Sequence, residues 1–137
     1  MAQAAELIGD RWTLLILREA FYGVTRFEDM HEDLEAPRSA LTERLRRLVD
    51  ARLLERVPYR EPGSRTRWAY VLTEKGLDLA FTFLALTAWG EKHITGEAAP
   101  VEVRDVETDE PLSLRLLNAD RNIVPIQRAR LRRRSEV

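Results

Sequence analysis

Arginines at regular spacing are the residues of this chain with the clearest chemical potential. Arg38, Thr42 and Arg46, here called the arginine row, follow one another at intervals of four, so a helix would align them on one polar face. A second group lies in the segment REPGSRTR: Arg60, Arg65 and Arg67. Between positions 36 and 67 there are nine arginines and four acidic residues, and nine minus four leaves a local surplus of five positive charges. A concentrated basic patch of this kind indicates contact with a polyanion.

The rest of the composition indicates one main domain with an appendage. The 137 residues carry a formal net charge of -1, so the positive charge is local rather than general. Hydrophobic residues make up 45% of the sequence, which is enough for a packed core. No apolar run reaches transmembrane length and no signal-peptide pattern is visible, so we expect a cytoplasmic protein that does not contact a membrane.

Several kinds of site chemistry find no support in the residue types. The sequence has no cysteine and two histidines, and neither His31 nor His93 has a neighbour at metal-ligand spacing. There is no glycine-rich phosphate loop and no nucleophile–base pair. We therefore expect no metal, no cofactor and no enzymatic activity.

A run of carboxylates precedes the arginine row: Glu28, Asp29, Glu32, Asp33 and Glu35. Carboxylates four residues apart on a helix are one way to build an acid–base pair or a cation site. A solvated helix face is the simpler interpretation. Because negative charge repels phosphate, we expect this helix to face sideways from a bound polyanion rather than lie on its backbone.

The N-terminal part has the pattern of two short helices. Residues 1–8 suit the first helix, and Gly9 suits its end. Asp10 can cap a second helix over residues 11–22 by accepting a hydrogen bond from an amide of its first turn. The apolar residues of this second helix cover more than one stripe, so we expect it to be central in the domain.

A pair of helices joined by a short turn should follow. Thr25 and Glu28 have the spacing of a capping box, which predicts a helix that ends near residue 34. Pro37 suits the first position of the next helix, over residues 37–51. That helix would place its leucines inward and the arginine row outward.

Two strands around the basic loop complete this unit. Residues 53–59 and 68–72 have strand composition, and the REPGSRTR segment between them contains proline and glycine for a turn. A hairpin with a long basic tip after such a helix pair is a wing. We therefore predict a mainly α fold with a small β wing, a winged helix-turn-helix, over residues 1–95.

The residues after the wing predict self-association. Thr73 can cap a long helix that runs to about Ile94 and is apolar over most of its circumference. Such a helix needs a partner besides its own core, and the same helix of a second subunit is the most economical one. The side chains that we expect at this homodimer interface are Leu77, Phe81, Leu84, Ala88 and Trp89.

Residues 96–137 should form a short C-terminal β appendage. Apolar and polar residues alternate in 101–106, 112–117 and 123–126, which predicts three short strands. Five arginines between residues 128 and 134 predict a basic tail.

With these segments laid out, the chain resembles the HxlR family of bacterial winged-helix transcriptional regulators. The matching segments are LIGDRWTLLILREAFYGVTRFEDM, LTERLRRLVDARLLERVPY, YVLTEKG and AWGEKH. The resemblance implies a homodimer built from the N-terminal and last long helices, one recognition helix per subunit, and regulation of nearby genes, usually by repression. Many members also have a cysteine sensor near the start of the first helix, and this sequence has no cysteine with which to build one.

On this interpretation the helix over residues 37–51 reads DNA. Side chains in the first half of a recognition helix reach base edges in the major groove, which makes Arg38 the candidate for bidentate contact with guanine. Ser39 and Thr42 are short enough for base edges or phosphates, and Arg46, one turn farther on, suits a phosphate. Two such helices related by a two-fold axis would read a pseudo-palindromic operator. The alternative is a solvated polar helix face.

The wing arginines have a similar pair of interpretations. Arg60, Arg65 and Arg67 suit the minor groove or the phosphates beside it. The alternative for Arg65 and Arg67 is a surface salt bridge with Glu61, which would contribute little.

A small-molecule effector and a protein partner are further hypotheses. Trp12, Trp89 and His93 are the candidate residues of an effector pocket near the expected dimer interface. The alternatives are a histidine that interacts with the helix dipole and tryptophans that belong to the core or interface. A winged helix that binds protein through its apolar last helix, without specific DNA binding, is the competing function.

Overall fold

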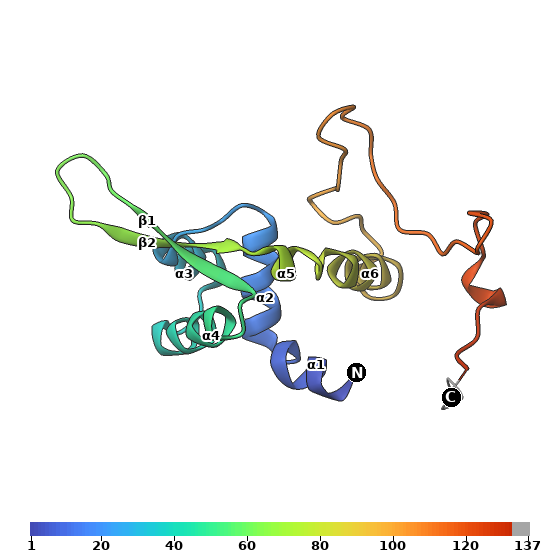
Figure 1. Ribbon diagram of the computed structural model, residues 1–137, viewed down its shortest axis with the longest axis horizontal. Coiled ribbons are helices and arrows are strands. Elements are labelled where there is room, and N and C mark those ends of the chain that lie inside the picture. The colour runs from blue at the N-terminus through green and yellow to red at the C-terminus, as the bar shows by residue number, and fades with distance from the viewer. Residues whose placement is uncertain (133–137) are drawn as a thin grey trace. The chain divides into compact units, whose positions relative to one another are not determined.

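The structure, a computed structural model, describes residues 1–132 and divides into two compact units (Figure 1). The first unit is Met1–Phe83, and the second begins at Leu84. This division falls inside the last α-helix, Ala80–Gly90. The domain boundary predicted after residue 95 stays a prediction. Within residues 1–132, no helix is both long and apolar enough to cross a membrane.

In residues 1–83, four helices precede an antiparallel hairpin, which confirms the predicted winged helix-turn-helix. The helices are α1 (Ala2–Ile8), α2 (Arg11–Phe21), α3 (Phe27–Leu34) and α4 (Arg38–Asp50), and the strands are β1 (Leu54–Tyr59) and β2 (Arg67–Leu72). Leu54 pairs with Leu72 at the base of the hairpin and Tyr59 with Arg67 near its tip. Figure 1 shows the hairpin extending from the helical body as an arm.

The second helix is central in the first unit, as its apolar pattern predicts. It packs against α3, α4 and β2. The buried apolar side chains come from these elements and from the turns between them: Ile16, Leu17, Ala20, Met30, Ala36, Leu41, Leu45, Leu48, Leu53 and Leu54. Burial of this set fixes the inner face of α4 and so determines which of its residues face solvent.

Asp10 caps α2, as expected, and also ties it to α4. Its carboxylate accepts hydrogen bonds from the Thr13 amide at 3.2 Å and the Thr13 hydroxyl at 2.5 Å. Arg44 Nε of α4 donates to the same carboxylate at 3.0 Å. Burial acts to raise the pKa of Asp10, but the Thr13 hydrogen bonds and the Arg44 guanidinium outweigh it and lower the pKa below its ordinary value.

The capping box predicted for Thr25 and Glu28 is wrong. The third helix begins at Phe27, and Arg26 occupies its N-cap position without a side-chain hydrogen bond. The backbone of this segment instead joins the wing, because the Thr25 carbonyl accepts from the Tyr70 amide at 2.7 Å. The Glu28 carboxylate has a different partner, an arginine of α4.

The single long helix predicted after the wing is also wrong. Two shorter helices follow, α5 (Glu74–Leu77) and α6 (Ala80–Gly90), and a π-helical turn spans Glu91–Thr95. Thr73 caps α5 as predicted, since its hydroxyl accepts from the Gly76 amide at 3.0 Å. Gly76 is buried against the Leu53 carbonyl. The Leu79 amide then bonds back to the Gly76 carbonyl, a tighter i to i−3 turn that separates α5 from α6.

The three strands predicted in the C-terminal extension do not form within its described part, residues 96–132. Isolated bridges join Arg104 to Pro111 and Leu117 to Ile123, and a 3-10 helix spans Ile126–Arg128. The apolar side chains of these segments stay largely exposed, so no core holds a sheet together. Of the predicted basic tail, Arg133 and Arg134 lie outside the described residues.

Candidate nucleic-acid interface

A tight turn sets the direction of α4. Glu35 adopts a left-handed conformation (φ 49°), and Ala36 is buried. The Ala36 carbonyl lies 2.8 Å from Nδ1 of His31, so α3 holds the start of the turn. Pro37, with φ −54°, is the N-cap residue of α4, so the helix begins at Arg38, one position later than its sequence suggests.

The outer face of α4 presents the predicted residues to solvent. Arg38, Ser39, Thr42 and Arg46 are all exposed, whereas the leucines of the same helix are buried. The helix therefore has the orientation that its periodicity predicts.

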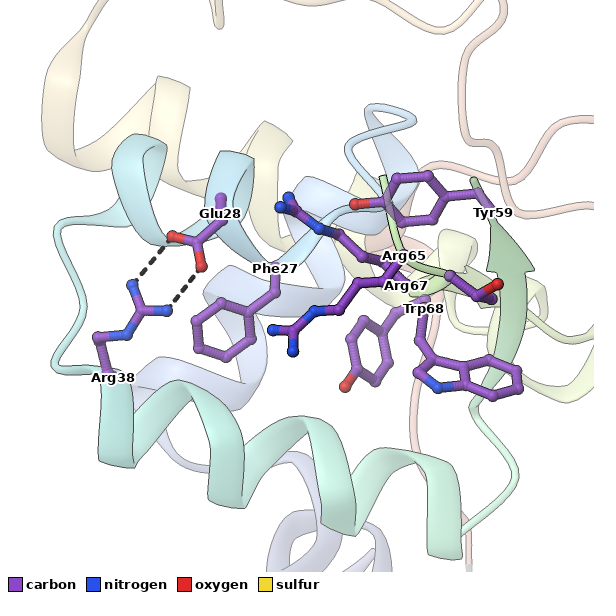
Figure 2. A pocket seen from close by; sticks show the side chains of 9 residues that line it. Phe27, Glu28, Arg38, Tyr59, Arg65, Arg67 and Trp68 are labelled. Carbon is purple, nitrogen blue, oxygen red and sulfur yellow. Dashed lines mark hydrogen bonds and ion pairs between the residues drawn. The ribbon is translucent and has the colours of Figure 1, made fainter. Parts of the chain in front are cut away.

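Arg38 already has an acidic partner. Its Nη1 and Nη2 donate to the two carboxylate oxygens of Glu28 at 2.9 and 2.6 Å, a bidentate pair that links α3 and α4 (Figure 2). The same guanidinium lies over the Phe27 ring, 4.9 Å from its centroid. Two neighbouring residues of α3 thus fix the position of Arg38.

The Glu28–Arg38 pair is strong in geometry but open to water. The hydrogen bond to Arg38 lowers the pKa of Glu28 and raises that of Arg38, with the charge of Arg67 adding to the effect on Glu28. Both side chains are more than half exposed, at 59% and 58%. An exposed pair is weakened by water and by salt, so a competing ligand can displace it.

Arg46 is paired within its own helix. It donates to Glu43 at 2.9 and 3.2 Å and to Asp50 at 2.7 Å. The hydrogen bond to Arg46 lowers the pKa of Glu43. Arg46 therefore starts from a partly neutralised state, like Arg38.

The wing arginines differ from those of α4. Arg60 Nε donates to the Ser64 carbonyl at 2.9 Å, which stabilises the tip of the loop. Within residues 1–132, neither Arg65 nor Arg67 makes an ion pair. The alternative salt bridge with Glu61 is wrong, since Glu61 pairs instead with Arg26.

Arg26 is a member of this surface that sequence reasoning missed. Its Nη1 lies 2.6 Å from the Glu61 carboxylate, and its guanidinium lies over the Tyr59 ring at 4.4 Å. An isolated antiparallel bridge also joins Arg26 to Ala69 of β2, so the Thr25–Arg26 segment lies beside the wing hairpin. The sequence shows Arg26 just before a predicted helix. Its partners Tyr59 and Glu61 lie more than thirty positions away, so local spacing does not predict them.

A cleft of about 700 Å³ lies between the wing and the start of the helix pair (Figure 2). Its lining combines guanidinium groups with aromatic rings: Phe27, Glu28, Arg38, Tyr59, Arg65, Thr66, Arg67, Trp68 and Tyr70. Figure 2 shows Arg65 and Arg67 reaching from the wing toward α3. The cleft thus brings Arg38 together with two of the three predicted wing arginines, and it suits an anionic ligand with flat apolar parts.

The residues predicted at the dimer interface are mostly exposed in the single chain. Leu77, Phe81 and Trp89 have exposed fractions of 57%, 67% and 56%. Ala88 is exposed as well, and Leu84 is half-buried. An apolar surface of this kind is uncommon unless something covers it.

The candidate effector residues are divided between the two units. The rings of Trp89 and His93 lie together, with centroids 5.5 Å apart. Trp12 belongs to the first unit, where the Arg11 guanidinium lies over its ring at 5.0 Å. A shared pocket for these three residues stays a prediction.

A family model described as HxlR-like helix-turn-helix matches residues 7–98. The chain is 42% identical over 118 residues to an uncharacterized HTH-type transcriptional regulator of Mycobacterium tuberculosis, and the match covers 85% of this chain and 73% of the relative. It is 32% identical over 93 residues to the HTH-type transcriptional regulator YodB of Bacillus subtilis, covering 67% of this chain and 81% of that relative.

Solved structures agree with the sequence matches. The crystal structure of PA1607, a candidate transcription factor, superposes with a TM-score of 0.77 at 30% identity and covers 97% of this chain and 93% of that chain. The reduced form of YodB from B. subtilis gives a TM-score of 0.59 at 31% identity, covering 70% of this chain and 93% of that one. The match to PA1607 therefore extends beyond the winged helix into the C-terminal extension.

Proposed function

The chain belongs to the HxlR-like helix-turn-helix family of transcriptional regulators, and from this premise we propose that it represses transcription by binding a pseudo-palindromic operator as a homodimer. The observation that carries the proposal is the cleft, where an exposed recognition helix and a basic wing present arginines toward one space. A helix fits the major groove of B-DNA, and an adjacent wing reaches the neighbouring backbone or minor groove.

The two parts of the surface have different tasks in this proposal. Arg38 reads a guanine, Ser39 and Thr42 contact base edges or phosphates beside it, and Arg46 contacts a phosphate. The wing residues Arg60, Arg65 and Arg67 grip the backbone or enter the minor groove. The aromatic side chains of the cleft pack against deoxyribose, which is the uncharged part of the DNA backbone.

Self-association completes the proposal. The exposed apolar side chains after the wing gain a partner when a second copy covers them, and two copies supply the two recognition helices that a palindrome requires. Repression then follows from steric exclusion of the transcription machinery at the operator. A small aromatic effector bound near Trp89 and His93 would alter the spacing of the two recognition helices.

Selection of bound duplexes from a random DNA pool, followed by footprinting, tests this function. The expected result is one enriched motif with two inverted half-sites whose centres lie about 34 Å apart, or a multiple of that distance. Enrichment of a single unpaired half-site would contradict the dimeric reading of DNA. A pool without any enriched motif would contradict specific binding and favour the protein-binding alternative.

A further inference from the structure

The Glu28–Arg38 pair occupies the base-reading arginine before DNA arrives. Both terminal nitrogens of Arg38, Nη1 and Nη2, donate to Glu28, at 2.9 and 2.6 Å. End-on contact with the two acceptors of guanine uses these same two nitrogens. Arg38 must therefore leave Glu28 before it makes that contact.

Arg65 and Arg67 line the same cleft and are not occupied in this way. Within the described residues neither makes an ion pair. Phosphate can therefore reach these two guanidinium groups without displacing a carboxylate. The cleft thus contains two freely available cations and a third, nearest the expected base edges, that is neutralised.

We propose that Glu28 is a positioning residue that acts through Arg38 and lowers the affinity for DNA, by keeping the guanidinium from serving as a general phosphate ligand. The inference rests on the proposed DNA-binding function. On random DNA, a phosphate would have to replace two hydrogen bonds to a carboxylate, and it would leave that carboxylate beside the DNA backbone. The exchange gives little gain and adds repulsion between like charges.

The correct DNA site changes this balance. Guanine offers O6 and N7 at fixed positions, so Arg38 exchanges two acceptors for two acceptors. The other contacts of a fully seated recognition helix form at the same time and offset the loss of the pair. Arg67 also lies within electrostatic reach of Glu28, so the carboxylate keeps a cation nearby after Arg38 moves. Because Arg38 leaves Glu28 on the correct site and can stay paired on random DNA, Glu28 lowers the affinity for the correct site by at least as much as the affinity for random DNA.

A charge-neutral variant with a matched control tests the proposal. Glu28→Gln keeps the size of the side chain and removes its charge. Glu32→Gln makes the same change on the same helix, at a carboxylate that has no arginine partner within residues 1–132. The probes are the duplex that the wild-type protein selects from a random pool and a scrambled duplex of the same composition, each titrated by fluorescence anisotropy at several salt concentrations.

Glu28→Gln should tighten binding to the scrambled duplex by about three- to tenfold beyond Glu32→Gln, because it frees one cation for phosphate contact. The dependence of log affinity on log salt should become steeper by about one unit. Binding to the selected duplex should tighten by at least as much, because the wild-type protein has to break the pair there. In an Arg38→Ala background, Glu28→Gln should act no differently from Glu32→Gln.

Three results would overturn the inference. The two glutamine variants could behave alike, the Glu28→Gln effect could persist without Arg38, or Glu28→Gln could weaken the selected duplex alone, which would make Glu28 a support for the base contact. Thermal unfolding of each variant checks that the fold is intact. If the wild-type protein shows no salt-dependent DNA binding, the proposed function falls as well, whereas a normal wild-type preference with unresponsive variants removes this inference alone.

Discussion

At the scale of single residues, the arginines around the cleft differ in what they contact before DNA binds. Arg38 and Arg46 are held by carboxylates, and Arg65 and Arg67 make no ion pair within residues 1–132. This difference predicts different effects for their removal. Removal of an arginine that is held for base reading should change the sequence specificity of DNA binding. Removal of an arginine without an ion pair should change the salt dependence of the affinity.

Replacement of Arg38 by alanine tests the base-reading role. We expect a loss of about 1–3 kcal/mol on the selected operator and relaxed preference at one base step, because a bidentate guanine contact is removed. Competition titrations with operator variants at each position measure both effects. An equal loss on operator and scrambled DNA would contradict this role, since it would describe a phosphate contact.

Replacement of Arg65 or Arg67 by alanine tests the wing. Each change should reduce the salt slope of binding by about one unit, with similar effects on operator and scrambled DNA. Arg104→Ala is the matched control, because Arg104 is held by Glu102 and Asp109 in the C-terminal extension. Wing variants that retain the wild-type salt slope would remove these arginines from the interface.

The sequence predicts the positions of the interface arginines better than their partners. Helical periodicity places Arg38 on the outer face of α4, and the structure agrees. The role of Glu28 was assigned from a local motif, yet its partner lies ten positions away on the next helix. Tertiary geometry determines whether a side chain pairs with a local or a distant partner, and sequence spacing alone does not predict that geometry.

At the scale of elements, the junction of α2 and α4 should depend on pH through Asp10. The pKa of Asp10 is lowered in the folded state. Its contribution to the free energy of unfolding is therefore present above its ordinary pKa and is lost as pH falls through its folded-state pKa. Asp10→Ala should lower the free energy of unfolding by about 0.5–2 kcal/mol at neutral pH, through loss of the helix cap.

Urea unfolding of Asp10→Ala at several pH values checks this expectation. The difference from wild type should narrow as pH falls from the ordinary carboxylate pKa of about 4 through the lower folded-state pKa of Asp10. Asp33→Ala, at an exposed carboxylate without a hydrogen bond in residues 1–132, should show no such narrowing. A constant difference for Asp10→Ala across this range would contradict the linkage.

Gly76, in α5, lies where two backbone segments approach closely. A Cβ at Gly76 would lie 2.1 Å from the Leu53 carbonyl oxygen. Because this neighbour is backbone, one of the two backbone segments would have to shift. Gly76→Ala should destabilise the protein by about 1–3 kcal/mol in urea unfolding, as overpacking does. Gly90→Ala meets open space in α6 and should instead be neutral or stabilising by about 0.5–1 kcal/mol. Equal stability of the two variants would contradict the account.

The elements with strong local patterns are the ones that the sequence predicts correctly. The cap at Asp10, the leucine stripe of α4 and the wing strands all follow from near neighbours in the chain. The predictions of one long helix and of three C-terminal strands are wrong because of tertiary contacts that sequence patterns do not show. Gly76 is required by contact with Leu53, and alternating residues in the extension find no core to cover them.

At the scale of the whole molecule, the exposed apolar side chains after the wing predict a dimer. Phe81→Glu, at a side chain that is 67% exposed in the single chain, should convert the dimer to a folded monomer by placing a charge in the interface. Sedimentation velocity measures the change in mass. Val57→Glu, at an exposed wing position, is the control and should leave the dimer intact. A monomeric wild type, or a dimeric Phe81→Glu variant, would contradict this interface.

Specific DNA binding is the central claim at this scale, and one comparison tests it most directly. Fluorescence anisotropy should compare DNA from upstream of the protein's own gene with a scrambled duplex, at about 50 and about 200 mM salt. We expect tight binding that weakens at the higher salt and prefers the upstream DNA by about 10³ or more. Absence of salt-sensitive binding to either duplex would contradict the account and favour a winged helix that binds protein.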